Sequence, residues 1–440
     1  MSVSRKGLVF ALVLTWAAAL RGQTPAPKIP DTGAGRIFQQ WLNAYNAGDS
    51  IALIEYARQH DPEMNVALNL AGRAVSGGVD VQSIEQSDAR HLEVVLKTRR
   101  TALTVYAVVD VSATEPTRAS TALAIVGETF DRQMLSLDAA ERALAIDSLA
   151  ATINRNYVFP EVGRRIADSL HARQARGAYD RTTNQVGFAQ RLTQELFEIA
   201  HDKHMVVNSF VGAPRRPSLA PAPSPTPARA PSPTPSPTMM RPACGYEGSV
   251  LEGNVGYVTF SNFRDPQECG ANASAAMNAI AGTRAVIIDL RKNGGGRPEM
   301  VAYLASYLFA GRTHLNDSWT RATGATEEWW TRDDVTGPKF GETKPVFILT
   351  SRLTISAAEE FAYDLQSLKR ATIVGETTAG AAHLTATSRI GAHLMIAVPI
   401  ARPINPVTKT DWEGVGVIPD VRVPADDALA SALKLIRARE

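Results

Sequence analysis

The chain is predicted to be an α/β protein, and its C-terminal half carries the main reason. Within 244–440, the runs VGYVTF, AVIIDL and PVFIL alternate with helical patterns. Each run is apolar throughout rather than alternating, as in strands that are covered on both faces. A helix-first, strand-later segment over 31–128 and a helical segment over 133–207 precede this core.

The segment 31–128 is expected to form a small α+β domain. Ile37, Phe38 and Trp41 recur at helical spacing, and three β-type runs begin at His91. The stretch WLNAYNAGD resembles the opening helix of cone-shaped NTF2-like domains. We assign no catalytic residue to this part of the chain.

Two segments connect this domain to the core. Residues 133–207 are expected to form a three-helix unit, with Asp138 and Glu141 as a capping box at its start. Residues 212–238 carry proline at nearly every second position, which excludes a helix or a central strand. We expect an extended, solvated linker there.

The N-terminus indicates export. Arg5 and Lys6 precede the run GLVFALVLTWAAAL, which has the length of a signal-peptide core rather than of a membrane span. We expect residues 1–23 to be a signal peptide, with an uncleaved anchor as the alternative. The chain would then be periplasmic or secreted, and Cys244 and Cys269 would form one disulfide or remain two buried thiols.

The charge balance excludes some partner classes. The net charge is +2 for 440 residues, and basic residues are not grouped in runs. This gives no reason to expect nucleic acid as a partner. We also expect no membrane span in the mature chain.

Ser356 is the most informative residue, because it follows the strand PVFIL at the start of an amphipathic helix. There its side chain lies at the positive end of the helix dipole, and free N–H groups of the first turn can hold an oxyanion. The alternative is structural: Ser356 and Glu359 have the spacing of a capping box.

Three other segments supply possible partners of a serine nucleophile. The strand AVIIDL ends in the glycines of RKNGGG, whose backbone can approach a ligand closely. Among eight histidines, His201, His204 and His383 are the candidates for a general base. Glu413 precedes a glycine turn, where a carboxylate can orient a histidine; a surface-loop role is the alternative.

Five ordered motifs over about 133–428 carry a family resemblance: GNVGYVTFSNF, VIIDLRKNGGG, TSRLTISAAEEFAYDL, IVGETTAG and EGVGVIPDV. The chain resembles the S41 peptidases, the tail-specific or C-terminal processing group. The resemblance implies a crotonase/ClpP-like core and peptide-bond hydrolysis by Ser356, without a metal or an organic cofactor. A peptide or protein is the implied substrate.

Two departures from the best-known branch indicate the tricorn-like or interphotoreceptor-retinoid-binding-protein-like branch. Ala381 occupies the position of that branch's dyad lysine, and no PDZ-like run of strands is visible. The resemblance then implies His204 as general base and Glu413 as its orienting carboxylate, which would raise the pKa of His204. Lys203 stands where the tricorn type has a helper serine.

The oxyanion hole is expected to combine the N–H of Ala357 with one from Gly295 or Gly296. Two other functions use the same core: non-catalytic binding of apolar ligands, and hydrolysis of small esters.

Overall fold

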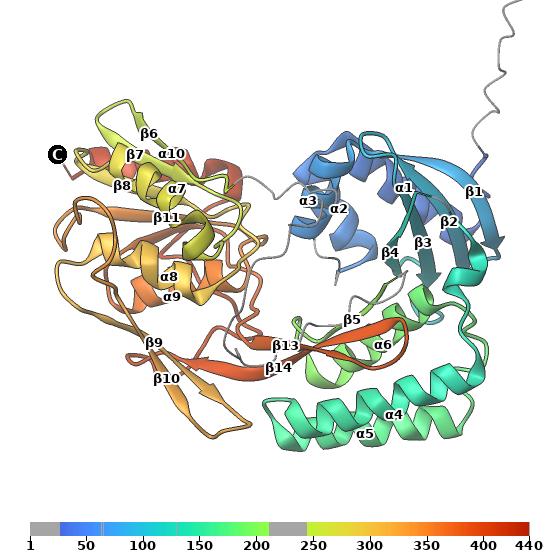
Figure 1. Cartoon of the computed structure of the whole chain (residues 1–440). Coiled ribbons are helices and arrows are strands. Elements are labelled where there is room, and N and C mark those ends of the chain that lie inside the picture. Colours follow the sequence, from blue (N-terminus) through green and yellow to red (C-terminus); the bar gives the residue numbers. More distant parts are fainter. Residues whose placement is uncertain (1–26, 63, 65, 129, 211–243, 440) are drawn as a thin grey trace, which may run out of the picture.

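The computed structural model describes residues 27–210 and 244–439, apart from 63, 65 and 129. Two lobes are visible in Figure 1: the core lobe, formed by the C-terminal segment, and a second lobe that contains the N-terminal domain and the helical unit. The expected signal peptide and proline-rich linker lie outside the described residues.

The N-terminal domain packs three helices against an antiparallel sheet with strands in the order β1-β2-β3-β4. Phe38, Trp41 and Leu92 are buried between the two layers. The NTF2-like character of this domain stays a prediction, and α3 was not predicted from the sequence. The elements are α1 (Gly33–Ala47), α2 (Ser50–His60), α3 (Val66–Ser76), β1 (Val79–Ser87), β2 (His91–Thr98), β3 (Thr104–Val111) and β4 (Ala119–Gly127).

The helical unit follows directly. The side chain of Asp138 accepts from the N–H of Glu141, whose carboxylate accepts from the N–H of Asp138, so the predicted capping box is present. The unit consists of η1 (Arg132–Leu135), α4 (Ala139–Asn156), α5 (Pro160–Ala175), α6 (Gln185–Ala200) and the short strand β5 (Val206–Ser209).

The core lobe is built on a sheet with strand order β15-β12-β11-β8-β7-β6, in which all neighbours are parallel except β6 and β7. Helices flank this sheet, so the prediction of an α/β fold is confirmed. The elements are β6 (Glu247–Leu251), β7 (Val255–Thr259), α7 (Pro266–Ala279), β8 (Ala285–Asp289), α8 (Pro298–Ala305), η2 (Ser306–Leu308), β11 (Val346–Thr350), α9 (Ala357–Ser367), β12 (Thr372–Gly375), β15 (Val421–Arg422), η3 (Ala425–Asp427) and α10 (Ala428–Arg437).

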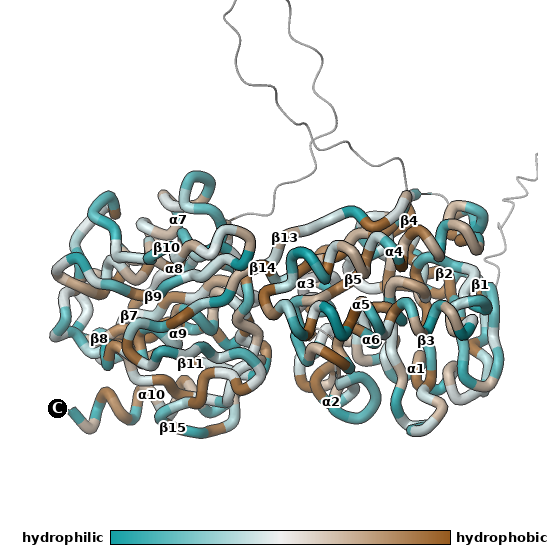
Figure 2. Tube along the Cα trace, turned by 90° about the horizontal axis from the view of Figure 1, so that it is seen from below, coloured by the Kyte–Doolittle hydropathy of each residue, from teal (hydrophilic) through white to brown (hydrophobic). Residues whose placement is uncertain are grey.

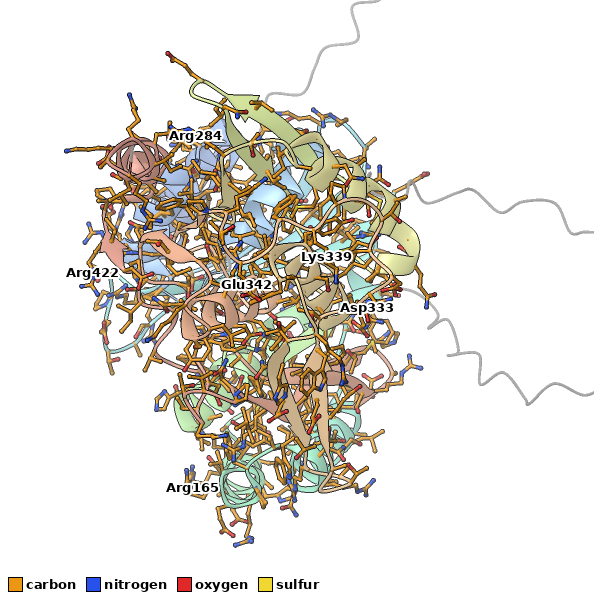
Figure 3. The ribbon with its side chains drawn as sticks, turned by 90° about the vertical axis from the view of Figure 1, so that its left-hand side faces the viewer. Arg165, Arg284, Asp333, Lys339, Glu342 and Arg422 are labelled. Atoms are coloured by element: carbon orange, nitrogen blue, oxygen red, sulfur yellow. A yellow bond between two sulfur atoms is a disulfide. The ribbon has the colours of Figure 1, made fainter. Side chains whose placement is uncertain are left out.

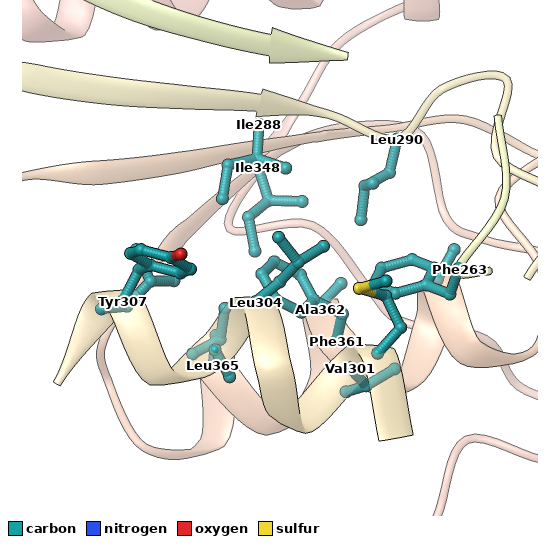
Figure 4. Close-up of a cluster of buried hydrophobic side chains, with 14 of the residues drawn as sticks. Phe263, Ile288, Leu290, Val301, Leu304, Tyr307, Ile348, Phe361, Ala362 and Leu365 are labelled. Carbon is teal, nitrogen blue, oxygen red and sulfur yellow. The ribbon is translucent and has the colours of Figure 1, made fainter. Parts of the chain in front are cut away.

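The interior of the core lobe holds α9 in place. Ile288 of β8 and Ile348 of β11 face the helices α8 and α9, where Leu304 and Phe361 fill the space between sheet and helices (Figure 4). All of these side chains are buried, which stabilises the lobe by roughly 1.5–3 kcal/mol for each large apolar side chain.

A second sheet joins the two lobes. It contains β9 (His314–Thr320), β10 (Thr326–Trp330), β13 (Leu384–Arg389) and β14 (Leu394–Ile404). The long strand β14 runs from the core lobe to the helical unit (Figure 1), where its residues Leu394–Ala397 pair with β5. This pairing brings the segment that precedes β5 near the segment that precedes β13.

Surface and stabilising features agree with an ordinary globular chain. Figure 2 shows hydrophobic segments on strands inside each lobe, and Figure 3 shows Lys339, Asp333 and Glu342 interspersed on one face.

A disulfide joins Cys244 to Cys269 of α7. Within the described residues, we find no helix with the length and apolar character of a membrane span.

Candidate active site

Ser356 lies in a strained turn between β11 and α9. Its backbone has φ of 60° and ψ of −126°, whereas an N-cap residue ordinarily lies in the β region. Such a conformation costs a non-glycine residue about 1–3 kcal/mol and persists only where its surroundings hold it. Gly295 packs directly against this turn, because a Cβ on Gly295 would lie 2.7 Å from the Cβ of Ser356.

The side chain of Glu359, one turn into α9, holds this conformation. Its Oε2 accepts from the backbone N–H of Ser356 at 2.9 Å and from that of Ala381 at 3.0 Å. Its Oε1 accepts from the N–H of Gly380 at 2.6 Å and from the hydroxyl of Thr378. The fully buried carboxylate therefore ties Ser356 to the loop GETTAG, so the capping and nucleophile interpretations of Ser356 are compatible.

The glycine loop after β8 offers one of the two N–H groups that the sequence analysis considered. The N–H of Gly295 donates to Oδ1 of Asn293 at 2.9 Å, so it is already used. In the described part of the chain, no group accepts from the N–H of Gly296 or of Ala357. Of the predicted oxyanion donors, these two N–H groups are the ones without an acceptor among the described residues.

A second cluster lies just beyond the GETTAG loop. Nδ1 of His383 is 2.6 Å from Oδ2 of Asp202 and 3.5 Å from Oε2 of Glu413. Glu413 Oε2 also accepts from the N–H of Ala382 at 2.5 Å, and Tyr157 donates its hydroxyl proton to Asp202 at 3.3 Å. His383 is 3% exposed and packs edge-on against Phe159.

His204 is adjacent to this cluster but is held differently. Its backbone N–H donates to Oδ1 of Asp202 at 3.0 Å, and the residue as a whole is partly exposed. Nδ1 of His204 is buried, and no described residue provides it with a hydrogen bond. The carboxylate of Glu413 contacts His383 and Ala382, so the structure does not give Glu413 the direct contact with His204 that we expected.

Asp202 had no predicted role, although it lies two residues before His204 in AHDKH. His383 was one of three histidines predicted as candidates for the base. An acidic residue closely preceding a candidate base is the signal that could have identified Asp202.

The two histidines have opposite electrostatic environments. Burial lowers the pKa of His204, against the opposing charge of Asp202. Burial also favours a lower pKa for His383. The hydrogen bond to Asp202 and the charges of Asp202 and Glu413 outweigh burial, so the pKa of His383 is raised. The expected rise in the pKa of His204 is therefore wrong in sign. Burial, followed by the charge of Asp202, raises the pKa of Glu413 to about 7.

Asp202, His383 and Glu413 each offer a metal-ligand atom, and these atoms lie within 4.8 Å of one another. The spacing of 2.6 Å between His383 Nδ1 and Asp202 Oδ2 is shorter than the separation of about 3.3 Å between two ligands of a tetrahedral zinc ion. It is the spacing of an N–H donor on a carboxylate, so in this arrangement His383 and Asp202 are hydrogen-bonded to each other.

Two models of one peptidase family match segments of this chain. Residues 254–423 match the model of peptidase family S41, and residues 132–243 match the N-terminal domain of Peptidase_S41 in eukaryotic IRBP. The chain belongs to peptidase family S41. Ser356 and Glu413 lie in the first matched segment, and Asp202 and His204 lie in the second, so two family segments meet at the site.

Individual relatives cover only part of this S41 chain. It is 29% identical over 175 residues to carboxyl-terminal-processing peptidase 2, chloroplastic, of Arabidopsis thaliana, which covers 39% of this chain and 32% of that protein. It is 27% identical over 170 residues to the chloroplastic C-terminal processing peptidase of Tetradesmus obliquus, covering 38% and 35%. The chain thus spans about a third of the length of these curated relatives.

Among solved structures, the photosystem II D1 C-terminal processing protease matches with a TM-score of 0.39 and 17% identity, over 66% of this chain and 94% of that one.

Proposed function

We propose that this S41 chain is an exported serine peptidase that cleaves peptide bonds through an acyl-enzyme on Ser356. The observation that supports this most is the strained Ser356 turn, which Glu359 ties to the GETTAG loop beside Asp202, His204, His383 and Glu413. A backbone strain that the surroundings maintain at cost is typical of functional residues.

His204 is the proposed general base. A base must reach the proton that it removes, and the ring of His204 makes no hydrogen bond to Asp202, whereas the ring of His383 is already bonded to that carboxylate. His204 would take the hydroxyl proton of Ser356 as its oxygen attacks the peptide carbonyl. The N–H groups of Ala357 and Gly296 would donate to the resulting oxyanion. Transfer of the proton from His204 to the leaving amine, with cleavage of the C–N bond, forms the acyl-enzyme, which water then hydrolyses.

Asp202 is the proposed stabiliser of the charged His204 ring. Its carboxylate fixes the backbone at His204 through Oδ1, and its negative charge favours the imidazolium form. Asp202 also holds His383 through Oδ2. Glu413 then acts on His383 and the Ala382 backbone, so its effect on His204 would be indirect.

Export and the substrate class complete the proposal. Residues 1–23 have the sequence of a signal peptide, and a chain with the disulfide Cys244–Cys269 suits an oxidising compartment. The matched relatives are named as C-terminal processing peptidases. Peptides and unfolded protein tails are therefore the substrates to test first, with small esters beside them.

A fluorophosphonate probe tests the assignment of the nucleophile. The full chain is incubated with the probe and the labelled peptide is identified by mass spectrometry, with Ser356→Ala as the control. Label on Ser356 in the wild type, and none in the variant, is the expected result. An unlabelled wild-type protein that also cleaves no peptide would overturn the proposal.

Binding of an apolar ligand is the second candidate function, because residues 132–243 match the N-terminal domain of the S41 segment in eukaryotic IRBP. Saturable quenching of tryptophan fluorescence by retinol, together with no probe labelling, would favour this function over hydrolysis.

A further inference from the structure

The loop that carries Ser356 reaches into the N-terminal domain through one side chain. Leu353 is 9% exposed and belongs to the same buried apolar cluster as Phe38, Trp41 and Leu92. Among the buried residues described in this cluster, Leu353 is the member that the core lobe contributes. Both Figure 1 and Figure 2 place the α2–α3 end of the N-terminal domain on the side that faces the core lobe.

Hydrogen bonds attach the rest of this loop to the core. The hydroxyl of Ser351 donates to the carbonyl of Arg291 at 2.5 Å and accepts from the N–H of Leu353 at 3.0 Å. The hydroxyl of Thr354 donates to the carbonyl of Leu290 at 2.8 Å, and the backbone carbonyl of Thr354 accepts from the N–H of Ala379. These contacts fix the backbone on one side and leave the Leu353 side chain directed into the other lobe.

We propose that Leu353 is a positioning residue through which the N-terminal domain holds the Ser356 turn in its reactive conformation. This rests on the proposed function of Ser356 as the nucleophile. The turn is strained at Ser356, so contacts on its flanks must keep it from relaxing. Glu359 supplies that support from the α9 side, and Leu353 supplies it from the side of β11.

The N-terminal domain would then affect the reaction through Leu353, without contributing a residue that contacts substrate. Loss of the Leu353 side chain leaves the hydrogen bonds of the loop in place but releases its apolar anchor. The Ser356 hydroxyl would then sample positions away from the base and the oxyanion donors. Displacements of about 1 Å in such a site lower turnover by up to about a hundredfold.

Leu353→Ala in the full chain tests this. We expect kcat for a peptide, and the rate of fluorophosphonate labelling of Ser356, to fall about tenfold to a hundredfold, with KM nearly unchanged. Leu353→Met, which keeps a long apolar side chain, should restore both rates to within about threefold of wild type.

Leu92→Ala, in β2, is the matched control: it removes the same side chain from the same cluster without touching the loop. All variants are compared below their unfolding temperatures, which circular dichroism measures. Wild-type labelling rates in Leu353→Ala, or an equal loss in Leu92→Ala, would overturn the proposal. Absence of labelling in the wild type would instead contradict the function of Ser356.

Discussion

Nδ1 of His383 lies 2.6 Å from Oδ2 of Asp202, while Oδ1 of the same carboxylate accepts from the backbone N–H of His204. One buried aspartate thus holds two histidines that are far apart in the sequence. The arrangement separates their roles: Oδ2 of Asp202 fixes the ring of His383, whereas Oδ1 fixes the backbone of His204 and leaves its ring without a hydrogen bond to Asp202.

Substitution of the two histidines distinguishes these roles. We expect His204→Ala to lower kcat/KM for a peptide by several orders of magnitude, since the base is lost. His383→Ala should cost less, about tenfold to a hundredfold, because it removes only support of the site. His171→Ala on the exposed face of α5 is the control. An inactive His383→Ala beside an active His204→Ala would show that His383 is the base.

The pH dependence of kcat/KM provides an independent test of the same assignment. A histidine base works when it is neutral, so activity rises with pH through the pKa of that residue. Burial lowers the pKa of His204, so the rising limb should have its midpoint below the ordinary histidine value of about 6.5. The pKa of His383 is raised, so a midpoint clearly above 6.5 that persists in Glu413→Gln would indicate His383 instead.

Glu359→Gln tests the link between Ser356 and the GETTAG loop. Each carboxylate oxygen of Glu359 accepts hydrogen bonds from two donors. In glutamine one of these oxygens is replaced by an NH₂ group, which cannot accept, so two buried donors would lose their acceptor. Unsatisfied buried donors cost about 1–3 kcal/mol each. We expect kcat to fall about a hundredfold while KM changes little.

Glu360→Gln, one residue further along α9, is the control for that substitution. Burial raises the pKa of Glu360 to about 7, so a neutral amide resembles a form that the native side chain already adopts. Activity near the wild-type level is expected. Equal losses of activity in the two variants would mean that any change in α9 disturbs Ser356, and would contradict a specific role of Glu359.

The features that could be predicted from the sequence are those set by residues close together in the chain, whereas contacts between distant residues could not be predicted. The Ser356 junction, the capping box Asp138–Glu141 and the apolar strands of the core follow from neighbouring residues, and the structure contains them. The meeting of Asp202 with His383 depends on the pairing of β5 with β14, which no local pattern specifies. For the same reason the sequence could not assign Glu413 to His383. The N–H of Gly295, in contrast, donates to Asn293 two residues earlier, a local Asx turn that the asparagine in RKNGGG could have indicated.

Reduction of the disulfide should destabilise the core lobe without abolishing its chemistry. Cys244 and Cys269 are separated by 25 residues, for which loop-closure entropy gives about 3 kcal/mol. We expect the double variant Cys244→Ser/Cys269→Ser to unfold at lower denaturant concentration and to keep kcat/KM within about threefold of wild type at low temperature. Titration of free thiols in wild-type protein purified without a reductant would contradict the bond itself.

Glu413→Gln should change how stability depends on pH. The pKa of Glu413 is raised to about 7 in the folded chain, against an ordinary value of 4.5. Between these two values the folded state binds more protons than the unfolded state, so wild-type stability falls as pH rises through this window. Glutamine has no such titration. The free energy of unfolding of the wild type, minus that of the variant, should therefore decrease by about 2–3 kcal/mol from pH 4.5 to pH 8.

Urea unfolding at both pH values measures the difference. A difference that stays constant would mean that Glu413 titrates as an ordinary glutamate, and an increase would mean that His383 holds it ionised.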